Sequence, residues 1–338
     1  MIARLPPLAV TQGDPAGIGP ELAIKAWLAR REAELPPFFI LADPENLRVV
    51  AARFGLACPI VEASPEEAGS AFPEALPIVP LPMRVSAEPG RPDPATAPAT
   101  LAAIEEAVAL TRAGRASAVV TNPIAKHVLY AAGFAHPGHT EYLAALAADP
   151  GAPPRRAVML LWSEALAIVP VTIHIPLRDV PATLTADLIV DTARIVAADY
   201  ASRFGIARPR LALAGLNPHA GEAGTIGTED RDIVAPAVAR LRAEGLDVSG
   251  PWPADTMFHA RARGGYDVAL GMYHDQALIP IKTLAFDDGV NCTLGLPFIR
   301  TSPDHGTAFD IAAQGVARPD SLISAIRLAG RLAATAAA

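Results

Sequence analysis

The sequence predicts an α/β protein of two lobes, in which mostly parallel sheets carry helices on both faces. Three observations lead to this prediction. Short apolar runs alternate along the chain with longer segments of helical periodicity, which is the element order of a parallel sheet with helical crossovers. The chain has 338 residues, enough for two lobes that each bury a core. Hydrophobic residues make up 51% of the chain but aromatic residues only 5%, so mainly aliphatic side chains must form those cores.

The first third of the chain supplies the first strands and helices. Residues 8–11 form a short apolar strand, and Pro20 then suits the first turn of a helix. FFILA at 38–42 is the next buried strand. The eight prolines between 73 and 98 exclude a regular helix or a central strand, so this stretch is predicted to be an extended surface connection. A helix over 100–113 follows it.

The remaining strands come at regular intervals. A strand is predicted over 116–121, after which Asn122 and Pro123 are expected to cap and open a helix. Four further apolar runs predict buried strands at 157–162, 165–172, 210–216 and 267–273. We expect 1–125 plus 288–338 to form the first lobe and 126–287 the second.

Charge and composition exclude several classes of function. The chain has 35 acidic and 28 basic residues, a net charge of −7, and no basic run, so neither nucleic acid nor an anionic membrane is an expected partner. The most apolar stretch, 157–171, is interrupted by Ser163 and Glu164 and is too short to span a bilayer. Cys58 and Cys292 form no CxxC pair, and MIARLPPLAV lacks the features of a secretory signal. These features predict a cytoplasmic protein.

Three histidines each follow a predicted strand: His174, His219 and His274. In parallel α/β sheets, ligands collect beyond the carboxyl ends of the strands. Three neutral imidazoles with an open fourth position are a common catalytic arrangement for zinc and related ions. The alternative is that each histidine is a hydrogen-bonding loop residue, and position in the chain alone does not decide between them.

The motifs around these histidines resemble the 4-hydroxythreonine-4-phosphate dehydrogenase family of vitamin B6 biosynthesis. The matching segments are TQGDPAGIGPE (11–21), TNPIAKHVLYAAGFAHPGHTEYLA (121–144), VTIHIPLRDV (171–180), GLNPHAGE (215–222), PADTMF (253–258), YHDQALIPIK (273–282) and GVNCTLGLPFIRTSPDHGTA (289–308). Two loops depart from the family pattern. Thr225 and Ile226 stand where many relatives carry histidine and methionine, and FDDGVN at 286–291 is less basic than expected.

The resemblance implies a two-lobed fold like that of isocitrate and isopropylmalate dehydrogenases, with a cleft between the lobes. It implies a homodimer that contributes residues to each active site, with a divalent ion (Zn, Mg or Co) and NAD or NADP as cofactors. The implied metal ligands are His174, His219 and His274. The implied substrate contacts are His139, Thr140, Lys282, Asn291 and Arg300.

The implied reaction is the oxidation of 4-(phosphooxy)-L-threonine to a β-keto acid, which decarboxylates to 3-amino-2-oxopropyl phosphate. The departures from the family pattern leave open a paralogue that acts on a phosphorylated four-carbon hydroxy acid or an aromatic cis-dihydrodiol dicarboxylate. Two other classes also remain open. One is a metal-dependent hydrolase with Asp255 or Asp275 as base, and the other is a non-catalytic metal-binding protein.

Lys282 and Asp255 are the candidates for proton transfer. Lys282 ends an apolar run, where desolvation lowers the pKa of an amine; an ordinary surface lysine is the alternative. Asp255 can instead cap the segment that follows it, and Thr140 can cap a helix as well as bind substrate, since those two roles are compatible. Arg300 follows the apolar LPFI, so a phosphate or carboxylate partner is expected there.

The cofactor site has a weaker pattern. Gly13, Gly17 and Gly19 give GxxxGxG, the wrong order for a Rossmann pyrophosphate turn, so a tight packing turn is expected. Cofactor contacts are expected instead from the 287–305 loops, with Asp304 and His305 as candidates. The remaining histidines (127, 136 and 259) are expected to be structural or exposed.

Overall fold

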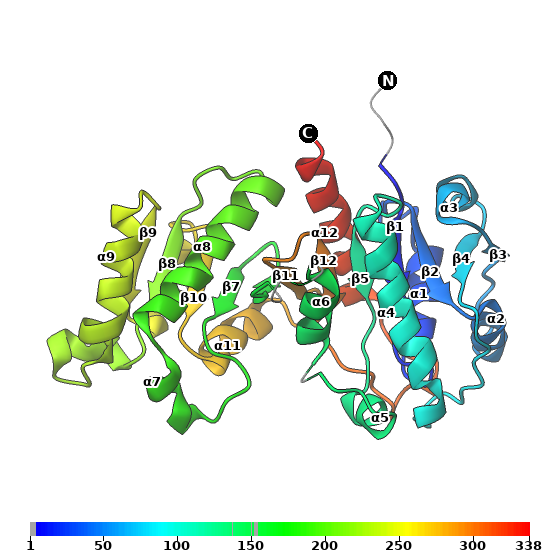
Figure 1. Cartoon of the computed structure of the whole chain (residues 1–338), viewed down its shortest axis with the longest axis horizontal. Helices are drawn as coiled ribbons and strands as arrows, with labels where there is room; N and C mark the ends of the chain where they lie inside the picture. The colour runs from blue at the N-terminus through cyan, green and yellow to red at the C-terminus, as the bar shows by residue number, and fades with distance from the viewer. Residues whose placement is uncertain (1–4, 137, 150, 152–154) are drawn as a thin grey trace. The chain divides into compact units, whose positions relative to one another are not determined.

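The computed structural model describes residues 5–136, 138–149, 151 and 155–338 and divides into two compact units (Figure 1). Unit 1 contains the chain up to Ala157 and Leu296–Ala337, and unit 2 contains Val158–Gly295. These boundaries differ from the expected ones. Residues 126–157 belong to unit 1, where α6 (His139–Ala147) packs against α4 (Ala97–Arg112). Residues 288–295 belong to unit 2, because β11 (Val290–Leu294) pairs with β6 (Val158–Trp162).

Unit 1 contains a parallel sheet in the order β3-β4-β2-β1-β5-β12. Its strands are β1 (Leu8–Thr11), β2 (Phe38–Ala42), β3 (Ile60–Glu62), β4 (Leu76–Pro80), β5 (Val119–Thr121) and β12 (Arg300–Pro303). The strands predicted at 8–11 and 38–42 are confirmed residue for residue.

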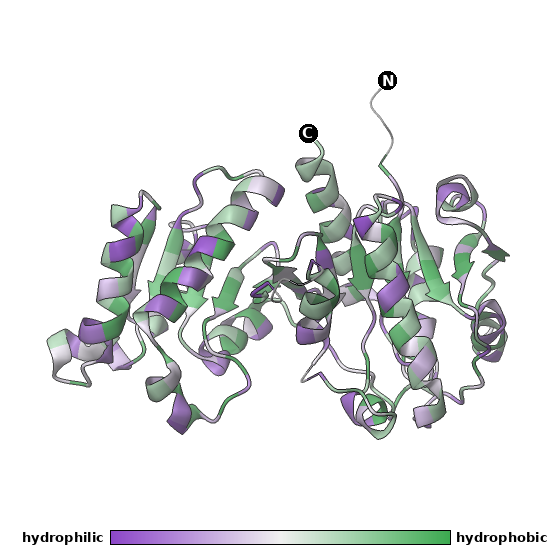
Figure 2. Cartoon of the chain, viewed as in Figure 1, coloured by the Kyte–Doolittle hydropathy of each residue, from purple (hydrophilic) through white to green (hydrophobic). Residues whose placement is uncertain are grey.

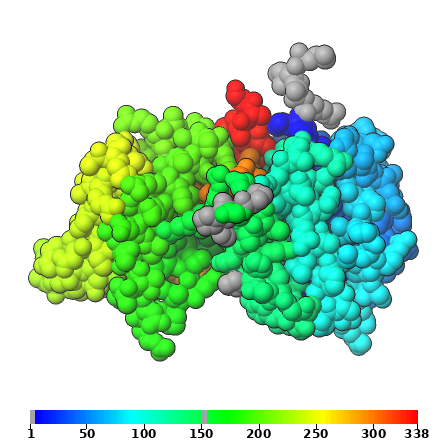
Figure 3. All heavy atoms as spheres, in the orientation of Figure 1, coloured from blue at the N-terminus to red at the C-terminus, as the bar shows by residue number. Residues whose placement is uncertain are grey.

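Helices cover both faces of the unit 1 sheet. Two consecutive residues of β12, whose side chains point to opposite faces, show this directly: the Thr301 hydroxyl donates to the Ala325 carbonyl on α12 (Asp320–Ala336), whereas Arg300 contacts His139 on α6. Helix α4 packs against α6 and against β1, β2 and β5, and its atoms form part of the front face of this unit in the space-filling view (Figure 3). The other helices of this unit are α1 (Gly19–Leu28), α2 (Pro44–Arg53), α3 (Pro65–Ala71) and α5 (Lys126–Ala131), with the short η1 (Pro94–Thr96).

Strand β4 corrects the prediction for the proline-rich stretch. It lies between β2 and β3, so it is an inner strand and not a surface connection. A parallel strand directs successive N–H groups to alternate neighbours, so Pro77 and Pro80 remove only one donor on each side. The ladder survives through the other groups: the Leu76 N–H donates to the Pro59 carbonyl, and the Ile78 carbonyl accepts from Ala63.

Helix α5 also begins later than predicted, at Lys126 with Ala125 at its N-cap. Asn122 therefore does not cap it. The Asn122 side-chain amide instead donates to the Thr11 carbonyl at 2.9 Å, which joins the ends of β5 and β1.

Unit 2 contains a mixed sheet in the order β11-β6-β7-β10-β8-β9. Strand β6 runs antiparallel to both of its neighbours, and the remaining pairs are parallel. The strands predicted within 157–162, 165–172, 210–216 and 267–273 are confirmed as β6, β7 (Ala167–Pro170), β8 (Leu211–Ala214) and β10 (Val268–Gly271). The edge strand is β9 (Val248–Trp252).

Two groups of helices pack in unit 2. Helices α8 (Ala186–Arg203) and α9 (Ala235–Ala243) pack against each other, and α11 (His274–Leu284) packs on β6, β7 and β10. Short elements complete the unit: α7 (Val180–Thr183), α10 (Ala260–Arg263), η2 (Leu177–Asp179), η3 (Pro218–Gly224), η4 (Asp230–Val234) and η5 (Ala254–Thr256).

The predicted α/β class with a mostly parallel sheet is confirmed. The central strands of each unit are strongly hydrophobic, and hydrophilic residues lie on the outer sides of the helices (Figure 2). Among the described residues, no helix has both the length and the apolar character needed to cross a membrane.

Candidate active site

His174 and His274 lie beyond the carboxyl ends of two adjacent strands, β7 and β10, as the sequence predicted. Their ring centroids are 5.7 Å apart. Both line a cavity of about 270 Å³, which Thr172, Tyr273 and Asp275 also line. The Thr172 hydroxyl donates to the Met272 carbonyl at 2.8 Å, so the two histidine-bearing segments are joined directly.

The His274 ring has a neighbour that suits a metal ligand. Its Nδ1 lies 2.7 Å from Oδ1 of Asp275. When Nδ1 carries the proton and donates it to this carboxylate, Nε2 keeps its lone pair for an ion, as in many carboxylate–histidine–metal sites. The donor set therefore fits a divalent ion. Asp275, considered above as a hydrolytic base, orients His274 in this arrangement.

His219 lies on a different loop, η3, and is exposed. From His219 to Ala223 the backbone has five consecutive positive φ values: 54, 52, 75, 42 and 57°. Within the described part of the chain, no three histidine, cysteine, aspartate or glutamate side chains gather as a metal-binding group. One chain thus brings together two of the three predicted ligands and holds the third on a separate loop.

A buried carboxylate anchors the His219 loop. Asp230 is 1% exposed, and its Oδ1 accepts from the Leu216 N–H at 2.6 Å. Its Oδ2 accepts from both the backbone and the side-chain amide of Asn217, each at 3.0 Å. A Cβ on Gly221 would lie 3.2 Å from the same Oδ2, so the loop closes tightly over this carboxylate. Sequence reasoning did not single out Asp230, because the residues that it binds lie 13 and 14 positions earlier.

The two candidates for proton transfer lie on different elements of unit 2. Lys282 is half-buried, two helical turns after His274 on α11, with Nζ 5.6 Å from the centroid of the Phe286 ring. Asp255 is exposed on η5. Because η5 contacts η3, Asp255 lies beside the loop that carries His219 and is grouped with it. Pro253 is the N-cap of η5, so Asp255 does not have the capping role considered as its alternative. Asn291 lies on β11 with a buried Oδ1 that accepts no hydrogen bond within the described residues.

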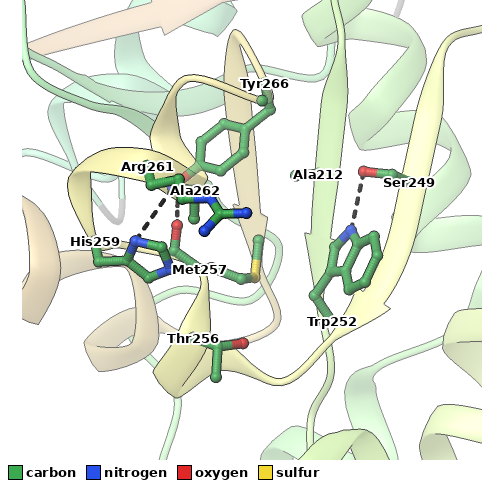
Figure 4. Close-up of a pocket in the computed structure, with 10 residues that line it drawn as sticks. Ala212, Ser249, Trp252, Thr256, Met257, His259, Arg261, Ala262 and Tyr266 are labelled. Atoms are coloured by element: carbon green, nitrogen blue, oxygen red, sulfur yellow. Dashed lines mark hydrogen bonds between the residues drawn. The ribbon is translucent and has the colours of Figure 1, made fainter.

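A separate pocket of about 520 Å³ lies beside η5 (Figure 4). Its walls include Trp252 and Tyr266, whose polar atoms are already bonded: the Trp252 indole N–H donates to Ser249, and the Tyr266 hydroxyl donates to the Met257 carbonyl. His259, another lining residue, is the N-cap of α10 and accepts from the Ala262 N–H, so its role is structural. None of the predicted site residues lines this pocket.

Unit 1 holds the second group of predicted site residues. Arg300 is 4% exposed, and its Nε and Nη2 donate to the Thr121 hydroxyl at 3.1 and 2.6 Å. Nη2 also lies 3.5 Å from Nδ1 of His139. His139 and Thr140 are the first two residues of α6, whose N-cap is Gly138, so Thr140 does not have the capping role that was also considered for it. The Arg300 guanidinium thus lies between the Thr121 hydroxyl and the His139 imidazole at the N-terminus of α6.

His139 is neutral in this setting. Burial lowers its pKa well below the usual value, and the positive charges of Arg300 and Lys126 lower it further. Its Nε2 is buried and makes no hydrogen bond to any described residue. Since a buried polar atom without a partner costs free energy, this nitrogen is available to a ligand.

The glycine-rich turn after β1 is a packing device, as expected. A Cβ on Gly13 would lie 2.6 Å from the Pro123 carbonyl oxygen, and one on Gly17 would lie 3.0 Å from that of Thr307. The Ile18 N–H donates to the same Thr307 carbonyl at 3.0 Å. The turn therefore lies against the segment that carries the cofactor candidates Asp304 and His305.

Comparison with known proteins places these features in a family. The sequence profile of the family described as "Pyridoxal phosphate biosynthetic protein PdxA" matches residues 34–329, a range that includes every predicted site residue. The chain belongs to the PdxA family. The family predicted from the motifs is thereby confirmed. The predicted class, an oxidoreductase of pyridoxal phosphate biosynthesis, is confirmed as well.

PdxA relatives match the chain almost from end to end. A 4-hydroxythreonine-4-phosphate dehydrogenase from Methylorubrum populi is 65% identical over 97% of this chain and 94% of its own length. The crystal structure of the Klebsiella pneumoniae 4-hydroxythreonine-4-phosphate dehydrogenase is 38% identical with a TM-score of 0.85, covering 98% of this chain and 99% of its own. A terephthalate 1,2-cis-dihydrodiol dehydrogenase from Burkholderia xenovorans is more distant, at 32% identity and a TM-score of 0.65, over 97% and 98% of the two chains.

Proposed function

We propose that this PdxA protein acts in the cytoplasm and oxidises 4-(phosphooxy)-L-threonine with NAD or NADP. The product is a β-keto acid that loses CO2 to give 3-amino-2-oxopropyl phosphate. The observation that carries the proposal is the 65% identity, over 97% of the chain, to a relative named for this substrate. The dihydrodiol dehydrogenase is only 32% identical, which favours the phosphorylated substrate over a diol.

We propose further that His174 and His274 of one subunit bind a divalent ion together with His219 of the partner subunit. The separation of η3 from the histidine pair supports this arrangement, because a single chain presents only two of the ligands together. A homodimer related by twofold symmetry would then carry two such sites. Asp255 would enter the partner's site with His219, since η5 contacts η3.

The reaction requires the substrate hydroxyl to approach an alkoxide before hydride leaves. Lowering an alcohol's pKa from near that of water by about 9 units requires about 12 kcal/mol. A general base contributes about 3–5 kcal/mol, so Lys282 and Asp255 are insufficient alone. A divalent ion held by the three histidines would supply the further lowering of the hydroxyl's pKa and Lewis-acid stabilisation of negative charge during decarboxylation.

The other residues have binding roles in this proposal. Arg300, His139 and Thr140 receive the anionic end of the substrate, because a buried guanidinium and a neutral imidazole with an open nitrogen meet there. Lys282 and Asn291 are the remaining substrate contacts in this proposal. Asp304 and His305 contact the nicotinamide cofactor, next to the packed glycine-rich turn.

Absorbance of the reduced nicotinamide tests the proposal. With 4-(phosphooxy)-L-threonine and NAD or NADP, absorbance should rise, and a chelator should stop it until a divalent ion is restored. A parallel assay with an aromatic cis-dihydrodiol dicarboxylate tests the paralogous activity. Release of inorganic phosphate without nicotinamide reduction would instead support a hydrolase and refute the dehydrogenase assignment.

A further inference from the structure

We propose that Lys126 is a further anion-binding residue of the unit 1 site, where it joins Arg300 and the N-terminus of α6 in holding a phosphate monoester dianion. This inference rests on the proposed substrate, which carries such a group. It adds a residue that neither the motif comparison nor the pattern of the chain assigned to the site.

The side chain of Lys126 reaches the N-terminus of α6. Lys126 is the first residue of α5, and Gly138 is the N-cap of α6. A Cβ on Gly138 would lie 3.4 Å from the Lys126 Nζ, so the ammonium group reaches the beginning of α6. Among the described residues, Lys126 makes no ion pair or side-chain hydrogen bond. Its charge is therefore available at this helix terminus.

The helix terminus offers donors as well. The first hydrogen bond within α6 runs from the Tyr142 N–H to the Gly138 carbonyl, so the N–H groups of its first turn have no partner within the helix. These groups and the helix dipole favour an anion. The buried Nε2 of His139, which has no partner, is the independent sign that a ligand binds here. The charges of both Lys126 and Arg300 act on the same imidazole.

Glu141 provides the competing explanation. Its Oε2 would lie 2.7 Å from the same Cβ of Gly138, so a carboxylate and an ammonium flank one point. If Lys126 served only to attract Glu141 and hold α5 against α6, loss of either charge would have the same effect. If Lys126 binds a dianion, the two losses have opposite effects, because Glu141 repels the ligand that Lys126 attracts.

Steady-state kinetics with 4-(phosphooxy)-L-threonine separate these explanations. Lys126→Gln should raise KM about tenfold or more, with a smaller change in kcat, because a charge-assisted hydrogen bond to substrate is lost. Lys126→Arg should restore most of the affinity. Glu141→Gln should leave KM unchanged or lower it. An unchanged KM for Lys126→Gln, or equal increases for Lys126→Gln and Glu141→Gln, would overturn the inference.

Binding of inorganic phosphate provides a test that does not depend on turnover. Calorimetry on the full-length protein loaded with its divalent ion should show phosphate binding that weakens about tenfold in Lys126→Gln and recovers in Lys126→Arg. Absence of turnover combined with this pattern would overturn the proposed substrate and leave the anion site standing. No phosphate binding, or binding that Lys126→Gln leaves unaltered, would refute the site even if the enzyme turns over its substrate.

Discussion

The single residue whose environment says most about the site is His139. It is buried beside two cations, which keeps its pKa well below the usual value, so it stays neutral when exposed histidines become charged. Neutral imidazole donates one hydrogen bond and accepts another, which suits a group that must contact both Arg300 and a ligand. The motif around His139 led to the prediction that it binds substrate. The sequence could not show its charge state, because that depends first on burial and then on the charges of Arg300 and Lys126, which lie 161 and 13 positions away in the chain.

The pKa of His139 makes a prediction about stability. In the unfolded chain its pKa is about 6.5, so below about pH 6.5 the unfolded state takes up a proton that the folded state excludes. The free energy of unfolding should therefore fall as the pH drops below this value. Urea unfolding from pH 8 to 5 should show a shallower fall for His139→Asn. Identical slopes in variant and wild type would contradict the assigned charge state.

Gly13 makes a second prediction at this scale. Its φ is 73°, and a Cβ would lie 2.6 Å from the Pro123 carbonyl oxygen. Gly114 is a matched control: its φ is 72°, and a Cβ added there would have nothing within 4 Å. Gly114→Ala should cost about 1 kcal/mol for its left-handed backbone alone, and Gly13→Ala clearly more. Equal losses in denaturant unfolding would show that the close approach to Pro123 is unimportant.

At the scale of elements, most strands were predictable because each is a short apolar run between breakers, as FFILA at 38–42 illustrates. Strand β4 was not predicted because its prolines were considered without knowledge of the two strands beside it, β2 and β3. The two prolines face opposite sides of the strand, and β3 is only three residues long, so few ladder bonds are lost. Which donors a strand can lose depends on its partners, and a single sequence does not reveal these.

Asp230 supports a prediction about the η3 loop. Asp230→Asn keeps the shape of the side chain but removes the charge and one acceptor oxygen, so unfolding free energy should fall by about 1.5–3 kcal/mol. Metal affinity should fall with it, because the loop that carries His219 loses its anchor. Both quantities can be measured by denaturant unfolding and by metal titration.

Asp232 is the control for this prediction. It is exposed and pairs with Arg231 beside it, so Asp232→Asn should leave the free energy of unfolding almost unchanged. A normal metal affinity in Asp230→Asn would show that the anchor does not position His219.

For the whole molecule, the predicted site residues form three groups: His139, Thr140 and Arg300 in unit 1, His174, His274 and Lys282 on two adjacent segments of unit 2, and His219 with Asp255 on η3 and η5. The motifs led to predictions of which residues take part in the site. The sequence could not predict this grouping, which depends on how the chain folds. The separation of the third group is the basis for a site shared between subunits.

Mixed dimers test the shared site. His174→Ala and His219→Ala should each be inactive as homodimers. After unfolding and joint refolding, half of the dimers should be mixed, each with one intact site, so about a quarter of wild-type activity should return. The control pair, His174→Ala with His274→Ala, alters the same half-site and should recover nothing. Equal recovery from both pairs, or none from the first, would refute the shared arrangement.

The left-handed run in η3 has a consequence for how the protein ages. Its four non-glycine residues each hold a backbone conformation that costs about 1–2 kcal/mol, so this loop should be among the first to open. Proteases cleave segments that are locally unfolded in this way. If His219 is fixed by an ion and a neighbouring subunit, cutting at this loop becomes slow, and protein that has lost its metal is degraded first. The rate of nicking would then report the fraction of molecules that are assembled and loaded.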